Sequence, residues 1–460
     1  MRKAIALIFI ITGYFLSAYA QDIPAIEPIK GTDKIMIFAP HPDDEALGCG
    51  GIIQEAVKAG ADVRIIYLTH GDHNQFAFIV YEKRLTIRQN EFIHMGEVRR
   101  KEAVKAMELL GLKSENLIFL GYPDFGTFAI FSQHWVKAKP YRSILTRISS
   151  VPYKSDFSYG FPYKGEYILS DLKSLLLLYK PNKIFVSHLA DVNGDHKALP
   201  LFLEVALADL RNDFPRPKVY HYLIHSVGWP LPRHYHPELS LLPPEKFDQA
   251  SVKWEQRILA PEEVHGKYQS MLCYRSQTSS SAFYLLSFCR KNELFGSAPE
   301  IDLFTSPKSS PVADFFKQLS SGKGGQKTKK AAAKPKPEDV SYRIAGGNLV
   351  ITTKKRQELD RRLITVLYIF GYSYSRPFPL MPKIRIVTKY NRYKVFKEGR
   401  VIKADGIGIK ITRAEFEIRI PLSFLKDPDF ILVSFRANPD TLPQDALSFR
   451  KINITKQKEQ

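Results

Sequence analysis

The chain has 460 residues, of which 44% are hydrophobic, and its 67 basic and 47 acidic side chains give a formal net charge of +20. This hydrophobic content excludes a disordered chain, and the length exceeds what one ordinary core organises, so we expect two domains. The positive balance favours anionic surroundings such as nucleic acid, acidic lipid or an anionic glycan.

The first 20 residues have the pattern of a secretory signal peptide. Arg2 and Lys3 precede an apolar run over residues 4–16, and Ala18-Tyr-Ala20 forms a small-x-small cleavage site. An uncleaved anchor is the weaker alternative, because the apolar run is short for a membrane span. We therefore expect a secreted protein, periplasmic or extracellular, with no transmembrane anchor after cleavage. Export makes nucleic acid an unexpected partner and favours an anionic envelope or extracellular polymer.

Residues 32–305 alternate between short apolar runs and helical patterns. The expected strands are 34–40, 63–69, 116–121 and 183–188, and the expected helices are 48–59, 97–110 and 170–179. Buried strands alternating with helices predict an α/β domain with a Rossmann-like, mostly parallel sheet and flanking helices. Ligands bind such sheets at the carboxyl ends of the strands.

Three further segments differ in composition. Residues 123–168 form an aromatic-rich insertion, which is typical of a lid or a binding wall. Residues 306–340 are rich in Lys, Ser, Gly and Pro and are expected to be a flexible linker. Residues 341–455 contain apolar residues at a spacing of two, which predicts an all-β sandwich. Carbohydrate binding and a purely structural role are both open for this module.

The three cysteines, Cys49, Cys273 and Cys289, are too few for a disulfide framework. Cys49 stands among small residues and is expected to be a buried thiol. The sequence leaves open whether Cys273 and Cys289 pair.

Two strand ends carry an unusual density of polar side chains. The first, after residue 39, reads Pro-His-Pro-Asp-Asp-Glu over 40–45, and the second reads His-Leu-Ala-Asp-Val-Asn-Gly-Asp-His over 188–196. Imidazole and carboxylate together form a ligand set suited to zinc. A catalytic zinc needs three protein ligands and one open position, and a nearby unligated carboxylate would serve as a base.

These motifs resemble those of the PIG-L (LmbE-like) family of zinc-dependent N-deacetylases. The resemblance covers about residues 32–290. It rests on Ala39-Pro-His-Pro-Asp-Asp-Glu45 with the following Leu-Gly-Cys-Gly-Gly, on Arg99, Glu102, Ala106 and Leu110-Gly111, on Asp124, on Asp191 to His196, and on Lys267, Tyr274, Ser276 and Gln277. The first of these motifs is very specific.

The resemblance implies roles for individual residues. His41, Asp44 and His196 would bind zinc, and Asp43 would be the general base for the attacking water. Asp195 would orient the network around His196.

The resemblance also implies that Arg99 and Asp124 bind substrate hydroxyls. The chain departs from one familiar form of the pattern at Asn193, where many members carry a histidine that stabilises the oxyanion and donates a proton. Asn donates a hydrogen bond but supplies no proton at neutral pH. Protonation of the leaving group would then fall to Asp43 or to His188.

We thus expect a secreted zinc-dependent hydrolase that removes an N-acyl group, expected to be acetyl, from an amino sugar or glycoconjugate. The alternatives are a catalytically weak carbohydrate-binding protein and an amide hydrolase that acts on a non-sugar conjugate. The sugar, its polymer and the oligomeric state are not indicated by the sequence.

Overall fold

The computed structural model describes residues 23–85, 88–245, 247, 252–305, 340–354, 364–389, 392–403, 406–411, 415–437 and 449–456. The expected signal peptide and the expected linker up to residue 339 lie outside these residues. The chain divides into two compact units, Met1–Ala298 and Pro299–Gln460. All three cysteines are free thiols. Among the described residues, no helix combines the length and apolarity needed to cross a membrane.

The first unit is a mixed α/β structure built on one sheet, as the strand and helix pattern predicts. Its described strands are β1 (Lys34–Ala39), β2 (Asp62–Thr69), β3 (Leu117–Tyr122), β4 (Lys183–Ser187), β5 (Lys218–Tyr222), β6 (Lys253–Ile258) and β7 (Asn292–Ser297). They lie in the order β3-β2-β1-β4-β5-β7-β6, and β1 to β5 are parallel. The antiparallel β7 lies between β5 and β6 and extends this parallel core.

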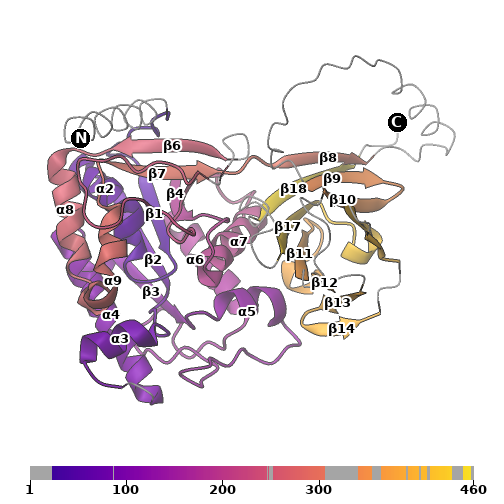
Figure 1. Cartoon of the computed structure of the whole chain (residues 1–460), viewed down its shortest axis with the longest axis horizontal. Helices are drawn as coiled ribbons and strands as arrows, with labels where there is room; N and C mark the ends of the chain where they lie inside the picture. The colour runs from indigo at the N-terminus through magenta and orange to yellow at the C-terminus, as the bar shows by residue number, and fades with distance from the viewer. Residues whose placement is uncertain are drawn as a thin grey trace, which may run out of the picture. The chain divides into compact units, whose positions relative to one another are not determined.

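Helices cover both faces of this sheet (Figure 1). The described α-helices are α2 (Asp44–Ala59), α3 (Gln75–Glu82), α4 (Gln89–Leu109), α5 (Thr127–Gln133), α6 (Gly165–Tyr179), α7 (Gly194–Asp209), α8 (Pro261–Met271) and α9 (Arg275–Leu285). Helices α2, α4, α8 and α9 lie on one face, and α6 and α7 on the other. Because both faces are covered, the central strands read as nearly continuous apolar runs, and all five residues of β4 are buried.

The strand order reverses between β1 and β4, and this reversal locates the site. From β1 the chain winds outward through β2 and β3, and it returns to the other side of β1 with β4 and β5. Phe38 pairs with Val186, so the two strands end at the same level. The crevice beyond the carboxyl ends at such a reversal is where open α/β sheets bind ligands. Both polar motifs of the sequence begin there.

The glycine-rich start of α2 allows close packing. A Cβ on Gly48 would lie 2.5 Å from the Tyr222 ring, and one on Gly51 would lie 2.2 Å from Leu259. The helix begins at Asp44, four residues before the expected start at residue 48. Asp44 and Glu45 therefore lie in its first turn, where the helix dipole favours carboxylates.

The second unit is strand-rich, as expected. Its described strands are β8 (Ile301–Thr305), β9 (Val340–Ala345), β10 (Asn348–Lys354), β11 (Ile364–Tyr372), β12 (Lys383–Lys389), β13 (Arg392–Lys397), β14 (Arg400–Ile402), β15 (Gly408–Ile411), β16 (Glu415–Pro421), β17 (Phe430–Ala437) and β18 (Arg450–Lys456). These strands form two sheets, β15-β16-β10-β9 and β14-β13-β12-β11-β17-β18-β8. One buried cluster takes side chains from both sheets, including Ile351 and Ile418 from the first and Leu367 and Ile431 from the second.

The expected end of the first domain at residue 305 is wrong by several residues. Strand β8, Ile301–Thr305, pairs in parallel with β18 and so belongs to the second unit. The sequence of β8, Ile-Asp-Leu-Phe-Thr, does not indicate which unit it joins, and only its pairing partner shows where it belongs.

Candidate metal and active site

Three side chains from two strand ends meet at a common point. Asp44 Oδ2 lies 3.1 Å from His41 Nδ1 and 3.1 Å from His196 Nε2, and the two nitrogens are 3.2 Å apart. His41 follows β1, Asp44 begins α2, and His196 lies in the first turn of α7. The structure thus brings together the three residues that the sequence predicted as metal ligands.

The three atoms fit a metal ion. Two imidazole nitrogens and one carboxylate oxygen are a donor set used by zinc, and tetrahedral bonds of about 2.0–2.1 Å separate ligand atoms by about 3.3–3.4 Å. The observed triangle of 3.1–3.2 Å is close to this value. All three side chains are buried, so they are held in place before any ion binds.

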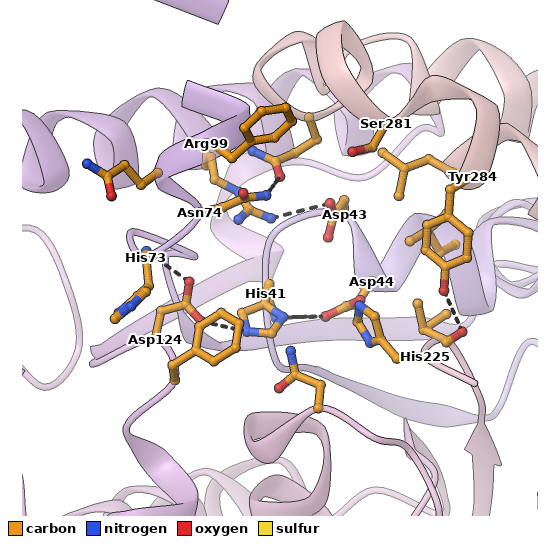
Figure 2. A pocket seen from close by; sticks show the side chains of 18 residues that line it. His41, Asp43, Asp44, His73, Asn74, Arg99, Asp124, His225, Ser281 and Tyr284 are labelled. Atoms are coloured by element: carbon orange, nitrogen blue, oxygen red, sulfur yellow. Dashed lines mark hydrogen bonds and ion pairs between the residues drawn. The ribbon is translucent and has the colours of Figure 1, made fainter. Parts of the chain in front are cut away.

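The remote nitrogen of each imidazole faces buried carboxylates. His41 Nε2 lies 3.0 Å from Asp124 Oδ1 and 3.3 Å from Asp195 Oδ2, whereas His196 Nδ1 lies 3.1 Å from Asp191 Oδ2. Figure 2 shows His41 between Asp124 and Asp44. Such partners fix which nitrogen carries the proton and leave the other free to bind a metal.

This arrangement corrects one expectation, the partner of Asp195. Asp195 contacts His41, and the partner of His196 is Asp191. Asp124 is 2% exposed, and besides facing His41 it accepts the His73 backbone N–H at 2.9 Å. It therefore faces the candidate ligand His41 and also lines the pocket, so its predicted contact with substrate hydroxyls stays a prediction. The sequence showed both carboxylates near the strand ends but not which imidazole each one faces.

The carboxylates perturb both imidazoles. Burial by itself lowers the pKa of His41, but Asp124, Asp195 and Asp44 outweigh it and hold that pKa well above the usual value. For His196 burial is likewise outweighed, by Asp191 and Asp44, and the pKa rises to about 9. A metal ion would take the place of these protons, because metal ligands must be deprotonated.

Asp43 lies in a strained turn beside the triangle. Its φ is 125°, a value that residues other than glycine rarely adopt. Its backbone N–H donates to Glu45 Oε2 at 3.0 Å, and the Tyr274 hydroxyl donates to Glu45 Oε1. These two buried hydrogen bonds of Glu45 stabilise the strained backbone conformation of Asp43.

Arg99 supports Asp43. The guanidinium Nη2 lies 3.3 Å from Asp43 Oδ2 (Figure 2). The same group donates to the backbone oxygens of Gly71 at 3.0 Å and Pro42 at 2.6 Å. Arg99 is 3% exposed and also lines the pocket, so its predicted contact with substrate hydroxyls stays a prediction. Burial raises the pKa of Asp43 to about 6, against the lowering effect of Arg99.

A pocket of about 540 Å³ opens over these residues, a volume within the range of about 300–1,000 Å³ that small-molecule sites occupy. Its lining comprises His41, Asp43, Asp44, Leu47, His73, Asn74, Gln75, Phe76, Arg99, Asp124, Phe125, Asn193, Ile224, His225, Gln277, Ser281, Tyr284 and Leu285. The lining combines His41 and Asp44 of the triangle with the candidate base Asp43 and apolar walls, whereas His196 is fully buried and does not line the pocket.

Asn193 and His188 have different positions. Asn193 lines the pocket and caps α7, since its Oδ1 accepts the Asp195 backbone N–H at 2.8 Å. His188 is not part of the pocket lining. Its Nδ1 accepts the Ala190 backbone N–H at 3.0 Å, and its ring stacks on Trp254 with centroids 6.0 Å apart. The structure therefore does not bring His188 to the pocket, and its predicted catalytic role stays a prediction.

A comparison with known protein families matches part of the first unit. Residues 36–207 match the sequence model of the PIG-L family, described as GlcNAc-PI de-N-acetylase.

These residues form a PIG-L family domain.

Two curated relatives match part of this chain. A 1D-myo-inositol 2-acetamido-2-deoxy-alpha-D-glucopyranoside deacetylase of Mycobacterium sp. (strain KMS) is 30% identical over 108 residues, which cover 24% of this chain and 33% of that protein. A diacetylchitobiose deacetylase of Thermococcus kodakarensis is 30% identical over 105 residues, covering 23% and 34%. The chain thus spans about a third of the length of these relatives.

Among solved structures, the N,N'-diacetylchitobiose deacetylase from Pyrococcus horikoshii is 17% identical and covers 59% of this chain and 86% of its own, with a TM-score of 0.36. The A40926 pseudoaglycone deacetylase Dbv21 is 16% identical, with coverages of 58% and 97% and a TM-score of 0.36.

The first unit also contains, beyond the matched residues 36–207, site residues that the sequence did not single out. His225 lines the pocket, its ring lies 4.5 Å from that of His196, and its Nδ1 lies 3.3 Å from Asp191 Oδ1. Tyr284 lines the pocket from α9. His225 follows β5 by three residues. The strand-end argument that found His41 and His196 extends to it, but no motif marks residues 218–225 as a strand followed by a ligand.

The last motif of the family pattern comprises Lys267, Tyr274, Ser276 and Gln277, and most of these residues make buried contacts outside the pocket lining. Lys267 forms a buried ion pair with Glu293 at 2.7 Å, and Ser276 donates to Glu102 at 2.6 Å. Of the four residues, only Gln277 lines the pocket.

Proposed function

We propose that this protein is a metal-dependent hydrolase that removes an N-acyl group, acetyl in the first instance, from an amino sugar or glycoconjugate. The observation that carries the proposal is the triangle of His41, Asp44 and His196 beneath a pocket that also holds Asp43. The two curated relatives are named as deacetylases of acetamido sugars. Their names support the choice of an N-acetylated sugar as the substrate.

We assign the metal to His41, Asp44 and His196, and we propose zinc. The donor set and the separations of 3.1–3.2 Å support this choice. Such an ion supplies Lewis-acid polarisation of the acyl carbonyl and activation of water.

The side chains of the pocket would perform the proton transfers. Asp43 takes a proton from the attacking water as the water oxygen bonds to the acyl carbon. The carbon–nitrogen bond then breaks, and the amine nitrogen receives the proton that Asp43 took from the water. Arg99 holds the Asp43 carboxylate in position. His225 and Asn193, both in the pocket wall, are placed to donate hydrogen bonds to the acyl oxygen and the leaving nitrogen.

Three further proposals concern the destination of the protein and the second unit. The pattern of residues 1–20 supports export to the periplasm or the extracellular space. The two sheets of the second unit share one buried cluster, which supports a β-sandwich. We propose that this unit binds a glycan or an anionic polymer of the envelope. The formal net charge of the whole chain, +20, suits an anionic polymer.

The decisive experiment measures acetate release together with metal content. The purified protein is incubated with N-acetylglucosamine, N,N'-diacetylchitobiose and a non-sugar N-acetyl amine, with and without a chelator. We expect about one zinc per chain, acetate release from the sugars, and loss of both in His41→Ala. An active protein without a divalent metal would refute the mechanism, and equal activity on the non-sugar amide would refute the substrate class.

A further inference from the structure

Phe125 adopts a backbone conformation that disfavours its own side chain. Its φ is 57°, in the left-handed region where the Cβ of an L-residue crowds the following carbonyl oxygen. For a bulky residue such a value is an outlier that other contacts must impose. Glycine would adopt it without this cost.

The contact that imposes the conformation comes from a carboxylate behind the metal triangle. Asp195 Oδ2 accepts the Phe125 backbone N–H at 2.6 Å, and Asp195 Oδ1 accepts the Thr127 backbone N–H at 3.0 Å. The same Asp195 faces His41 Nε2 at 3.3 Å. The loop that carries Phe125 is therefore fixed relative to the ligands.

Packing in the hydrophobic core does not account for the position of the Phe125 ring. The Phe125 side chain is 56% exposed, lines the pocket, and lies 5.1 Å from the His73 ring between centroids. A mostly exposed ring gains little from the hydrophobic effect. A strained backbone that holds an apolar ring at the edge of a reaction pocket indicates a role in ligand contact.

We propose that Phe125 is a specificity-determining residue that stacks on the apolar face of a pyranose ring. The C–H bonds of such a face carry partial positive charge and are attracted to the negative face of an aromatic ring. The preferred substrates are then N-acyl amino sugars in pyranose form, and the ring holds the sugar while the acyl group lies over the metal triangle. This inference rests on the proposed hydrolysis.

The kinetic test compares full-length variants on N,N'-diacetylchitobiose. We expect Phe125→Ala to raise KM about three- to tenfold, the scale of an aromatic contact, with kcat nearly unchanged. Phe125→Trp should restore KM. Phe157→Ala is the matched control, because Phe157 is 50% exposed but does not line the pocket, and its KM should equal that of the wild type. An unchanged KM in Phe125→Ala would overturn the proposal.

Two further measurements separate the alternatives. Phe125→Gly should melt at a higher temperature than Phe125→Ala, because glycine tolerates the positive φ, and equal melting temperatures would contradict the strain argument. If the KM increase appears with an N-octanoyl sugar but not with the N-acetyl sugar, the ring binds the acyl chain and the sugar-stacking proposal is wrong.

Calorimetric binding of N,N'-diacetylchitobiose distinguishes this inference from the proposed function. Binding that depends on Phe125 without acetate release would refute the hydrolysis and keep the sugar contact. Acetate release with no effect of Phe125 would refute the sugar contact alone.

Discussion

Substituting Asp191 by asparagine should weaken metal binding without changing any ligand. Asp191 is fully buried, and its Oδ2 lies 3.1 Å from His196 Nδ1 and accepts the His225 backbone N–H at 2.8 Å. Its Oδ1 accepts the Asn193 backbone N–H at 2.9 Å. An amide has only one acceptor oxygen. In either orientation its NH₂ group therefore faces a backbone donor, and the residue also loses its negative charge.

The magnitude follows from these contacts. Loss of the carboxylate partner of a metal-binding histidine typically lowers metal affinity about 10- to 100-fold, or about 1.4–2.7 kcal/mol. The mismatched donor adds a folding cost of about 1–3 kcal/mol. Asp191→Asn should accordingly both melt at a lower temperature and bind zinc more weakly.

A matched control separates the two effects. Asp171 is also buried, and it accepts the Tyr122 and Ser158 hydroxyls at 2.6 Å each. Neither hydroxyl belongs to a residue of the metal site. Asp171→Asn should lower the melting temperature but leave zinc affinity unchanged. Affinity is measured on folded protein by competition with a chromophoric chelator. Zinc affinity in Asp191→Asn within twofold of the wild type would refute the assignment of Asp191 as the residue that orients His196.

The other predictions concern the base, a buried carboxyl and the second unit. Asp43→Asn should retain zinc but lower kcat by at least about 100-fold, the scale of a lost general base; loss of zinc would show that Asp43 is a ligand. Burial and then Asp124 raise the pKa of Asp72 to about 7, so its folded-state pKa lies above the unfolded value of about 3.9. The folded state then holds the proton more tightly, and stability falls as pH rises from about 4 to 7. Asp72→Asn, which keeps an acceptor for the Tyr153 hydroxyl, should raise the melting temperature at pH 8 but not at pH 4. A chain that ends at Ala298 retains every pocket-lining residue and should hydrolyse a small soluble sugar at near the full rate; abolished activity would show that the second unit contributes to the site.

The sequence predicted the elements that hydrophobic runs and strand-end polarity encode. The central strands and the meeting of His41, Asp44 and His196 follow from short-range patterns together with the rule that parallel strands end at one edge. The start of α2 was missed because Asp44 and Glu45 look like loop residues, although the first turn of a helix favours carboxylates. The membership of β8 depends on its pairing with β18, which no local pattern specifies.

The contacts that the sequence could not specify are those of buried polar residues. Arg99 and Asp124 have the chemistry to bind hydroxyls, and both line the pocket. Their burial and their contacts with Pro42, Gly71 and His41 are properties of the fold. His188 also follows a strand, but its ring packs on Trp254 and does not line the pocket, and no local pattern in the sequence specifies that contact.

The buried charges of the site themselves argue for a cation. The carboxylates of Asp44, Asp124, Asp191 and Asp195 surround the imidazoles of His41 and His196. Burial of so many acidic groups is costly unless positive charge lies among them. The raised pKa values of the two imidazoles are one way in which the protein can supply that charge, by keeping their protons. A divalent ion at His41 Nδ1, Asp44 Oδ2 and His196 Nε2 supplies it without those protons and uses the same three atoms. The carboxylates that orient the imidazoles thus also favour a cation between them, so the local geometry and the charge balance lead to the same conclusion.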